Sequence, residues 1–319
     1  MKNHTRRLFC ALTFCAAAAA ATGSHAADKT YRVAYIARAQ SDSFAAWLAN
    51  SVTKEAKKYP DMQVTVFDGQ SRNEQMQAHI ENAVTSKFDL VIIQPYDPAI
   101  QIGPVKAAMA KGMKFVATNP RFDDNSIPSV DANPYQQGAE NAKLGLTQIH
   151  KDARVVVLMG PPGNPHSLGR REAWQKEFFD KRPDVKIVGE QIANWNKDEG
   201  MRLMEDWLQS QPKIDAVISM NDNMAAGAIE AVKGAKGKPM PLVYGVDGTA
   251  EACLLIKDGK MVSTTLQSAA ALATKAVAMA HNILTGKPTT LTDQIQAELI
   301  TKDNVDKYIA LHRELGNIK

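Results

Sequence analysis

Short apolar runs alternate with amphipathic helical segments along most of this 319-residue chain, and this rhythm constrains the fold more than any other feature. The clearest unit lies at residues 214–249. Residues 216–220 form an apolar run typical of a buried parallel strand, the Asn-Asp-Asn at 221–223 can cap the helix that follows, and residues 242–244 form the next strand. Strand, helix and strand at this spacing predict a βαβ unit.

The same rhythm runs through two halves of the chain. In the first half it predicts strands at residues 31–37, 62–67, 90–93 and 114–118. The pattern restarts near residue 129, with further strands predicted at residues 154–159, 185–191, 216–220, 242–244 and 262–265. We therefore expect an α/β protein with two doubly wound, Rossmann-like parallel-sheet domains.

The end of the chain suggests how the two domains are connected. An Ala-rich helix is expected at residues 268–284, where no second-half strand is left for it to cover, and an extended piece at 295–300 precedes a short terminal helix. This helix would return to the first half, and such a return implies several crossings and a hinged cleft. We expect a first lobe of residues 28–132 and 268–296, and a second lobe of residues 133–267 and 297–319.

The first 26 residues are typical of an export signal. Lys2, Arg6 and Arg7 precede an apolar core at residues 8–21, and Ser24-His25-Ala26 places small residues at the cleavage positions. We expect cleavage near Ala26/Ala27, a signal peptide of residues 1–26 and a periplasmic mature chain. Arg6-Arg7 also resembles a twin-arginine signal, so the sequence does not decide between the Sec and the twin-arginine export route.

Charge and cysteine content limit the classes of function. The signal carries three of the 38 basic residues and none of the 34 acidic ones, so the mature chain has 35 basic and 34 acidic residues. This balance gives no reason to expect a nucleic-acid partner. Cys253 is the only cysteine after the signal, so no internal disulfide is expected.

The motifs of catalysis and of cofactor binding do not stand out. The five histidines after residue 26 have neither metal-ligand spacing nor a cysteine partner, and we interpret them as surface or structural residues. No nucleophile motif of the G-x-S-x-G type occurs, and Gly160-Pro161-Pro162-Gly163 lacks the lysine of a phosphate loop. We expect no enzyme activity, no metal and no cofactor.

Polar side chains recur just after the predicted strands. Turn chemistry alone can place such residues there. Their number instead indicates a polar ligand site, because the carboxyl ends of parallel strands share one edge and amide, guanidinium and carboxylate groups suit a hydroxyl-rich ligand. These residues are Arg38, Asp42, Gln94, Asn119, Arg121, Asn221, Asp247 and Gln267. Phe44 and Trp195 are candidates for stacking on an apolar ligand face, with core packing as the alternative.

Several motifs in fixed order resemble those of the ribose-binding-like solute-binding proteins that serve ABC transporters. Asn221-Asp222-x-Met224-Ala225-x-Gly227-Ala228 is similar to the family's N-D-x-M-A-x-G-A, and Gly245-Val246-Asp247-Gly248-Thr249 is similar to its G-F-D-G-T. Arg170-Arg171-Glu172-Ala173-Trp174 resembles its R-x-x-G-F. The resemblance covers nearly the whole mature chain and implies a type I periplasmic binding protein fold.

The resemblance also implies roles for particular residues. Arg170, Asn221, Asp247 and Gln267 match sugar-contacting positions, with Arg170 and Asp247 each forking onto adjacent hydroxyls. The other matched positions are Trp195 for a stacking ring, Gln94 for an amide, and Asp42 and Phe44 for the first-strand Asn-Pro-Phe.

Three departures concern the ligand. Asn119-Pro120-Arg121 replaces the family's Asp-Arg, Val246 replaces an aromatic residue, and Asn133-Pro134 stands at the usual Asp-Asn of the domain crossing. They favour a polyol, cyclitol or modified sugar over a common pentose or hexose.

The resemblance implies a function in sugar transport. We expect a monomeric carbohydrate-binding protein of the periplasm that captures a sugar, polyol or cyclitol by hinge closure and delivers it to an ABC transporter permease in the inner membrane. The alternative is a periplasmic sensor that presents its ligand-bound form to a chemoreceptor or histidine kinase. The effector domain of a transcription regulator is a third interpretation, against which the export signal argues.

Overall fold

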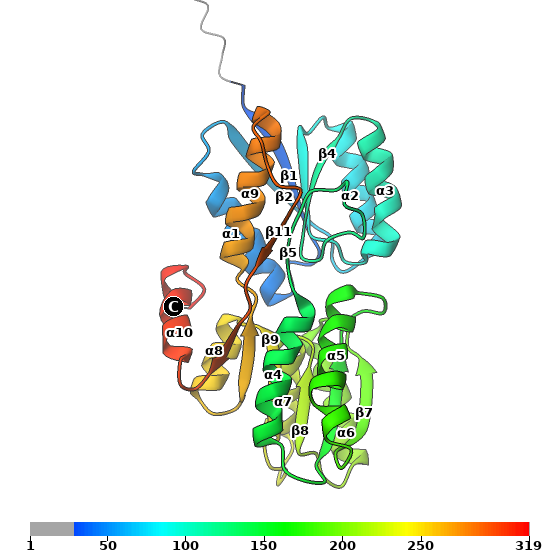
Figure 1. Ribbon diagram of the computed structural model, residues 1–319, viewed down its shortest axis with the longest axis vertical. Helices are drawn as coiled ribbons and strands as arrows, with labels where there is room; N and C mark the ends of the chain where they lie inside the picture. The colour runs from blue at the N-terminus through cyan, green and yellow to red at the C-terminus, as the bar shows by residue number, and fades with distance from the viewer. Residues whose placement is uncertain (1–28, 319) are drawn as a thin grey trace, which may run out of the picture.

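Two parallel sheets organise the chain in a computed structural model that describes residues 29–318 (Figure 1). The expected export signal and its cleavage site lie outside the described residues. The first sheet has the strand order β11-β5-β4-β3-β1-β2, and all its pairs are parallel. Its strands are β1 (Tyr31–Ala37), β2 (Met62–Asp68), β3 (Leu90–Ile93), β4 (Lys114–Thr118), β5 (Ser129–Ala132) and β11 (Thr292–Ile295).

The second sheet repeats this plan in the order β12-β10-β9-β8-β6-β7. Only its edge strand β12 runs antiparallel to its neighbour, β10. Its strands are β6 (Arg154–Met159), β7 (Lys186–Ile192), β8 (Ala216–Ser219), β9 (Leu242–Asp247), β10 (Ser263–Leu266) and β12 (Glu298–Thr301). Two doubly wound sheets confirm the predicted α/β fold class.

Helices cover both faces of each sheet, as continuous apolar parallel strands require. On the first sheet, α1 (Ser43–Ala56) packs with α9 (Ala269–Thr285), and α2 (Asn73–Thr85) packs with α3 (Pro98–Ala110). Strand β1 shows why both faces are needed, because Val33 and Tyr35 belong to one apolar cluster and Ala34 and Ile36 to another. We call this sheet and its four helices the first lobe.

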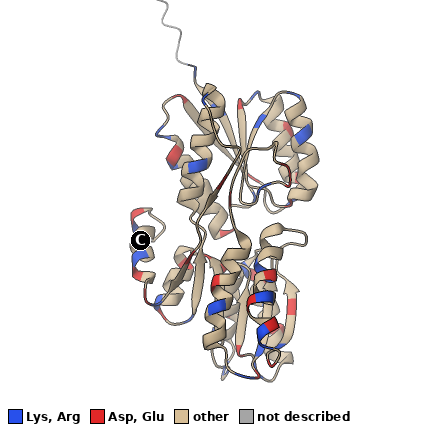
Figure 2. Cartoon of the chain, viewed as in Figure 1, with Lys and Arg blue, Asp and Glu red and all other residues tan. Residues whose placement is uncertain are grey.

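The second sheet and its helices form the second lobe. Helix α4 (Pro134–Gln148) packs with α5 (Pro165–Glu177), and α6 (Lys197–Ser210) packs with α7 (Asp222–Gly234). A 3-10 turn at Phe179–Lys181 follows α5, and α8 (Ala250–Lys257) packs with the terminal α10 (Val305–Glu314). Basic and acidic residues are interspersed on the outer helices of both lobes (Figure 2).

The chain passes between the lobes at three places in the structure: β5 leads into α4, β10 leads into α9, and β11 leads into β12. The sequence predicts one extended piece at residues 295–300, and this prediction is wrong. The structure has two strands there, since Ile295 pairs with Ala132 of the first sheet and Ile300 pairs with Thr264 of the second. Gln296 and Ala297 connect them.

The Asn164 side chain determines where α5 starts. The helix begins at Pro165, because the Asn164 side chain accepts hydrogen bonds from the backbone N–H groups of His166 and Ser167. Proline at the first helical position needs no hydrogen-bond acceptor for its nitrogen. Among residues 29–318, no helix has the length and apolar character needed to cross a membrane.

Helices α6 and α7 approach closely because glycines stand where they cross. A Cβ on Gly200 would lie 2.7 Å from the carbonyl oxygen of Met224, and one on Gly227 would collide with the carbonyl oxygen of Lys197. The backbone of one helix thus fills the space that a side chain on the other would need.

We therefore expect Gly227→Ala to lower the free energy of unfolding by about 1–3 kcal/mol, the usual cost of overpacking. Chemical denaturation measures this quantity. Gly234→Ala is the control at the last residue of the same helix, where no atom lies within 4 Å of the position that a Cβ would take. It should leave stability unchanged or raise it by up to about 1 kcal/mol. Equal effects of the two substitutions would contradict the close approach.

A buried carboxylate, Asp222, ties the start of α7 to two neighbouring segments. It accepts hydrogen bonds from Thr264 Oγ1 at 2.6 Å and from the backbone N–H of Thr249 at 2.8 Å. Burial raises the pKa of Asp222 to about 6, although these hydrogen bonds oppose the shift. Asp222 therefore holds a proton in the folded protein at a pH where it is ionised in the unfolded chain.

This shift predicts how stability depends on pH. Between about pH 4 and 6 the folded state binds more protons at Asp222 than the unfolded state, so the stability from this group falls as pH rises. Asp222→Asn removes the titration. From pH 4 to 7 the stability of the wild type relative to this variant should fall by on the order of 2–3 kcal/mol. Urea denaturation across this range tests the prediction, and parallel curves for the two proteins would refute it.

Candidate functional site

The carboxyl ends of both sheets face the boundary between the lobes and enclose a narrow cavity, which we call the inner cavity. It is lined by Arg38, Phe44, Asn119, Pro120, Asn164, His166, Arg170, Trp195, Asn221, Asp247 and Gln267. The volume of the cavity is about 20 Å³. One water molecule needs roughly 10–15 Å³, so the cavity has room for little more than one water molecule and the lobes lie close together in this conformation.

Eight of the residues predicted from the sequence line this cavity: Arg38, Phe44, Asn119, Arg170, Trp195, Asn221, Asp247 and Gln267. Of the other three, Arg121 lines a separate pocket. Asp42 and Gln94 lie behind Arg38 and hold it. Arg38 Nη2 is 2.8 Å from Asp42 Oδ1, and the Arg38 backbone N–H donates to Gln94 Oε1 at 3.3 Å. A direct contact of Asp42 or Gln94 with a ligand stays a prediction.

Arg170 lies at the centre of a buried polar network. Its Nη1 donates to the carbonyl oxygen of Met220 at 2.6 Å, and its Nε and Nη2 both donate to Gln137 Oε1 at 3.0 and 2.9 Å. Nη2 also donates to Gln267 Oε1 at 3.0 Å. Burial lowers the pKa of Arg170, which the nearby Asp247 opposes, and a guanidinium remains charged in proteins. These bonds hold the guanidinium at the cavity wall with its charge intact.

Asp247 is the last residue of β9 and faces this network. Its Oδ1 accepts from Gln267 Nε2 at 3.2 Å and lies 3.8 Å from Arg170 Nη2. The alternative role of Asp247, a turn former bonded to its own backbone, finds no support in these contacts. Burial raises the pKa of Asp247 well above its ordinary value, against the opposing charge of Arg170.

Several buried polar atoms around the cavity have no hydrogen-bond partner within residues 29–318. The donors are Arg38 Nη1, Gln94 Nε2, Asn119 Nδ2 and Asn221 Nδ2, and the acceptor is Asp42 Oδ2. Leaving such a group unsatisfied costs about 1–3 kcal/mol. Because these atoms come from both lobes, the arrangement suits a ligand that offers hydrogen-bonding groups to both.

Trp195 forms one wall of the cavity and depends on Gly160 for its place. A Cβ on Gly160 would collide with the indole ring, so the glycine after β6 leaves room for it. Two guanidinium groups lie near the ring, with Arg170 Cζ at 5.7 Å and Arg38 Cζ at 6.0 Å from its centroid. Gly160 thus serves the packing of Trp195.

Backbone conformation also marks the site. Asn119, Trp195 and Asp247 have positive φ angles of 49°, 62° and 131°. Such angles are uncommon outside glycine, cost on the order of 1–3 kcal/mol each and cluster at functional sites. All three residues line the inner cavity.

The sequence pattern misses three residues of this site: Gln137, Asn164 and His166. His166 is 4% exposed, so the interpretation of the histidines as surface or structural holds for it only as a structural residue. Its spacing to Arg170 is a usable signal, because residues four apart on a helix share one face. Gln137 gives no such signal, since it meets Gln267 from 130 residues away.

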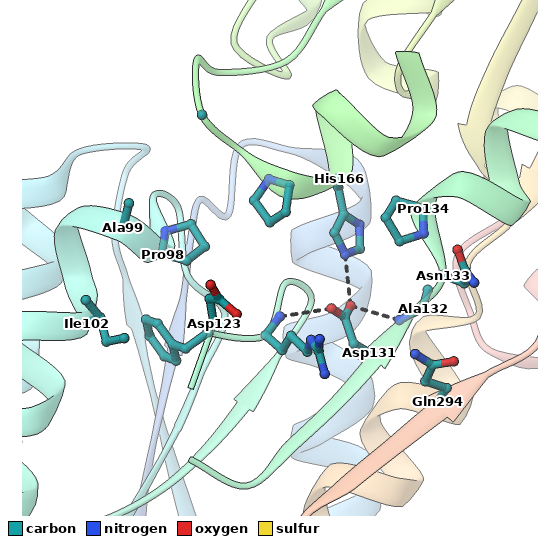
Figure 3. A pocket seen from close by; sticks show the side chains of 14 residues that line it. Pro98, Ala99, Ile102, Asp123, Asp131, Ala132, Asn133, Pro134, His166 and Gln294 are labelled. Carbon is teal, nitrogen blue, oxygen red and sulfur yellow. Dashed lines mark hydrogen bonds and ion pairs between the residues drawn. The ribbon is translucent and has the colours of Figure 1, made fainter. Parts of the chain in front are cut away.

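A wider opening, which we call the outer pocket, lies on the other side of His166. It has a volume of about 680 Å³ and takes its walls from the starts of α3, α4 and α5, from the loop after β4 and from β11. Figure 3 shows His166 and Asp131 joined at its centre, with Pro98 and Ala99 on one side and Pro134 and Asn133 on the other. The described residues contain no group of three or more His, Cys, Asp or Glu placed to hold a metal ion.

Proteins of known function resemble this chain over most of its length. The ribose import binding protein of Bacillus subtilis is 30% identical over 256 residues, which cover 80% of this chain and 82% of that protein. The xylitol-binding protein of Mycolicibacterium smegmatis is 28% identical over 232 residues, 72% of this chain and 66% of that protein.

Solved structures and a family model also resemble this chain. An ABC transporter solute binding protein from Bacillus halodurans with bound myo-inositol is 28% identical, has a TM-score of 0.80, and the match covers 89% of this chain and 98% of that one. Residues 33–288 match the family model described as a periplasmic binding protein domain. The chain therefore belongs to the periplasmic binding protein family.

Proposed function

We propose that this protein binds a neutral sugar, polyol or cyclitol in the inner cavity and delivers it to an ABC transporter permease of the inner membrane. The observation that carries this proposal is the set of unpaired buried donors and acceptor around the cavity. A hydroxyl group both donates and accepts, so a compact molecule with several hydroxyls can satisfy atoms of both kinds.

Charge supports a neutral ligand. Two buried guanidinium groups face the cavity, and each has a carboxylate nearby: Arg38 with Asp42 at 2.8 Å, and Arg170 with Asp247 at 3.8 Å. The charges therefore offset each other within the protein. An ionic ligand would leave one of its charges, or one of the protein's, without a partner in a buried site, which is costly.

The named relatives support the same chemical class. Their names refer to ribose, xylitol and myo-inositol, which all carry several hydroxyl groups and no charge. We assign ligand contacts to Phe44, Asn119, Arg170, Trp195, Asn221, Asp247 and Gln267, with Asp42 and Gln94 acting next to them. The indole of Trp195 offers an apolar surface for the C–H groups of such a ligand.

Entry of the ligand requires the lobes to separate, because the inner cavity is too small for it in the closed conformation. We propose that the lobes, residues 28–132 with 268–296 and residues 133–267 with 297–319, move as near-rigid bodies about the three crossings. Closure then traps the ligand and forms the surface that the periplasmic partner binds.

A thermal-shift panel on the mature protein tests the proposed ligand class. D-ribose, xylitol and myo-inositol are the first compounds, with zwitterionic L-leucine and anionic citrate as controls that carry charged groups. A ligand that binds only the folded state raises the melting temperature, by an amount that grows with its concentration over Kd. We expect at least one polyhydroxylated compound to do so and neither control. A rise with a charged control alone would overturn the proposal.

Asp247→Asn tests the assigned site. The amide turns one acceptor into a donor and leaves a ligand hydroxyl mispaired, so we expect affinity to fall about 10- to 1,000-fold by calorimetric titration with the compound that the panel identifies. Asp306→Asn is the matched control, because Asp306 is exposed and, within residues 29–318, its one ion pair is with Lys257 at 2.7 Å. Unchanged affinity with a lower melting temperature would show that Asp247 has only a structural role.

A further inference from the structure

The first turn of α5 joins the two lobes through Asn164. The Oδ1 atom of this side chain caps the helix by accepting from the backbone N–H groups of His166 and Ser167, at 3.0 and 3.4 Å. Its Nδ2 atom points the other way and donates to the carbonyl oxygen of Tyr96 in the first lobe, at 3.1 Å. One buried side chain thus both starts the helix and crosses the cleft.

His166 makes a second bond between the lobes. Its Nε2 lies 2.9 Å from Oδ1 of Asp131, and both side chains are less than a tenth exposed (Figure 3). Asp131 belongs to β5 of the first lobe and also accepts from the backbone N–H groups of Arg121 and Ala132. Burial raises the pKa of Asp131, but His166 and these donors outweigh it, so the carboxyl stays below its ordinary pKa.

The two partners of His166 fix the roles of its two imidazole nitrogens. An ionised carboxylate only accepts, so Nε2 donates to Asp131, and a guanidinium only donates, so Nδ1 accepts from Arg170. Nδ1 lies 3.3 Å from Arg170 Nη2. A chain of bonds therefore runs from the first lobe, through His166, to the Arg170 guanidinium at the wall of the inner cavity.

We infer that Asn164 and His166 form a latch that raises the closed fraction of the ligand-free protein, and that His166 is a positioning residue for Arg170. We call these two residues and their partners Tyr96 and Asp131 the α5 latch. The role of Arg170 as a ligand contact rests on the proposed function, whereas the latch itself concerns the lobes alone. Only the closed fraction holds the ligand tightly, so Asn164 and His166 affect ligand affinity by changing that fraction.

Two substitutions separate the latch from helix stability. Asn164→Asp keeps an N-cap acceptor but removes the donor to Tyr96, and aspartate caps helices as well as asparagine does. His166→Phe keeps a planar ring of similar size and removes both bonds. Asn196→Asp is the matched control: Asn196 caps α6 through Glu199 N at 3.0 Å, and its side chain has no other hydrogen bond within the described chain.

The distance between the lobes is measured without any ligand. Spin labels on Glu74→Cys in α2 and Glu205→Cys in α6 report it by double electron–electron resonance; both residues are exposed, and Cys253 is buried. We expect Asn164→Asp and His166→Phe to shift the population toward longer distances, and Asn196→Asp to leave it unchanged. Identical distributions in the wild type and both latch variants would overturn the latch.

The positioning role has its own readout, the NMR signal of the Arg170 Nε–H group, assigned by its loss in Arg170→Lys. It should move in His166→Phe, and also in Asp131→Ala, which removes the partner of the imidazole but keeps the ring. It should not move in Asn196→Asp. An Arg170 signal that is unchanged in both Asp131→Ala and His166→Phe would overturn the positioning role. Neither measurement uses a sugar, so a failed ligand panel would leave this result standing.

Discussion

The site depends on one buried guanidinium. Arg170 is 2% exposed, and removing its charge from water costs several kcal/mol unless hydrogen bonds and an opposite charge compensate. The compensation comes from separate parts of the second lobe: Gln137 of α4, the carbonyl at the end of β8, and Gln267 and Asp247 at the ends of β10 and β9. Holding this one group therefore fixes how four elements meet at the cavity.

The backbone around the cavity is less regular than the sheets that support it. Positive φ angles occur at Asn119, directly after β4, at Asp247, the last residue of β9, and at Trp195, in the loop between β7 and α6. The packed elements around these residues hold conformations that an isolated turn would relax. A glycine at position 160 then makes the space into which the indole fits. Backbone strain and close contact thus both occur where the polar atoms converge.

Local patterns in the sequence predict most of this architecture. Apolar runs separated by amphipathic helices are enough to predict two parallel sheets, and parallel strands bring their polar ends to one edge, so Asn221, Asp247 and Gln267 were expected together. The split of residues 295–300 into β11 and β12 was not predictable in this way, because each piece has only four residues and its partner lies far away in sequence. Contacts such as Gln137 with Gln267 and His166 with Asp131 depend on the folded arrangement and have no local signature.

The ratio of closed to open protein in the absence of ligand also affects how tightly the ligand is bound. The two cross-lobe hydrogen bonds of the α5 latch, at about 0.5–1.5 kcal/mol each, change the ratio of closed to open protein by a factor between roughly 5 and 150. A stronger latch raises affinity by lowering the free energy needed to close, but it also slows the opening that admits and releases the ligand. Because the latch has only these two cross-lobe hydrogen bonds, the ratio of closed to open protein stays moderate. A binding protein that must both retain its ligand and pass it on needs such a balance, and the short first turn of α5 is where this chain sets it.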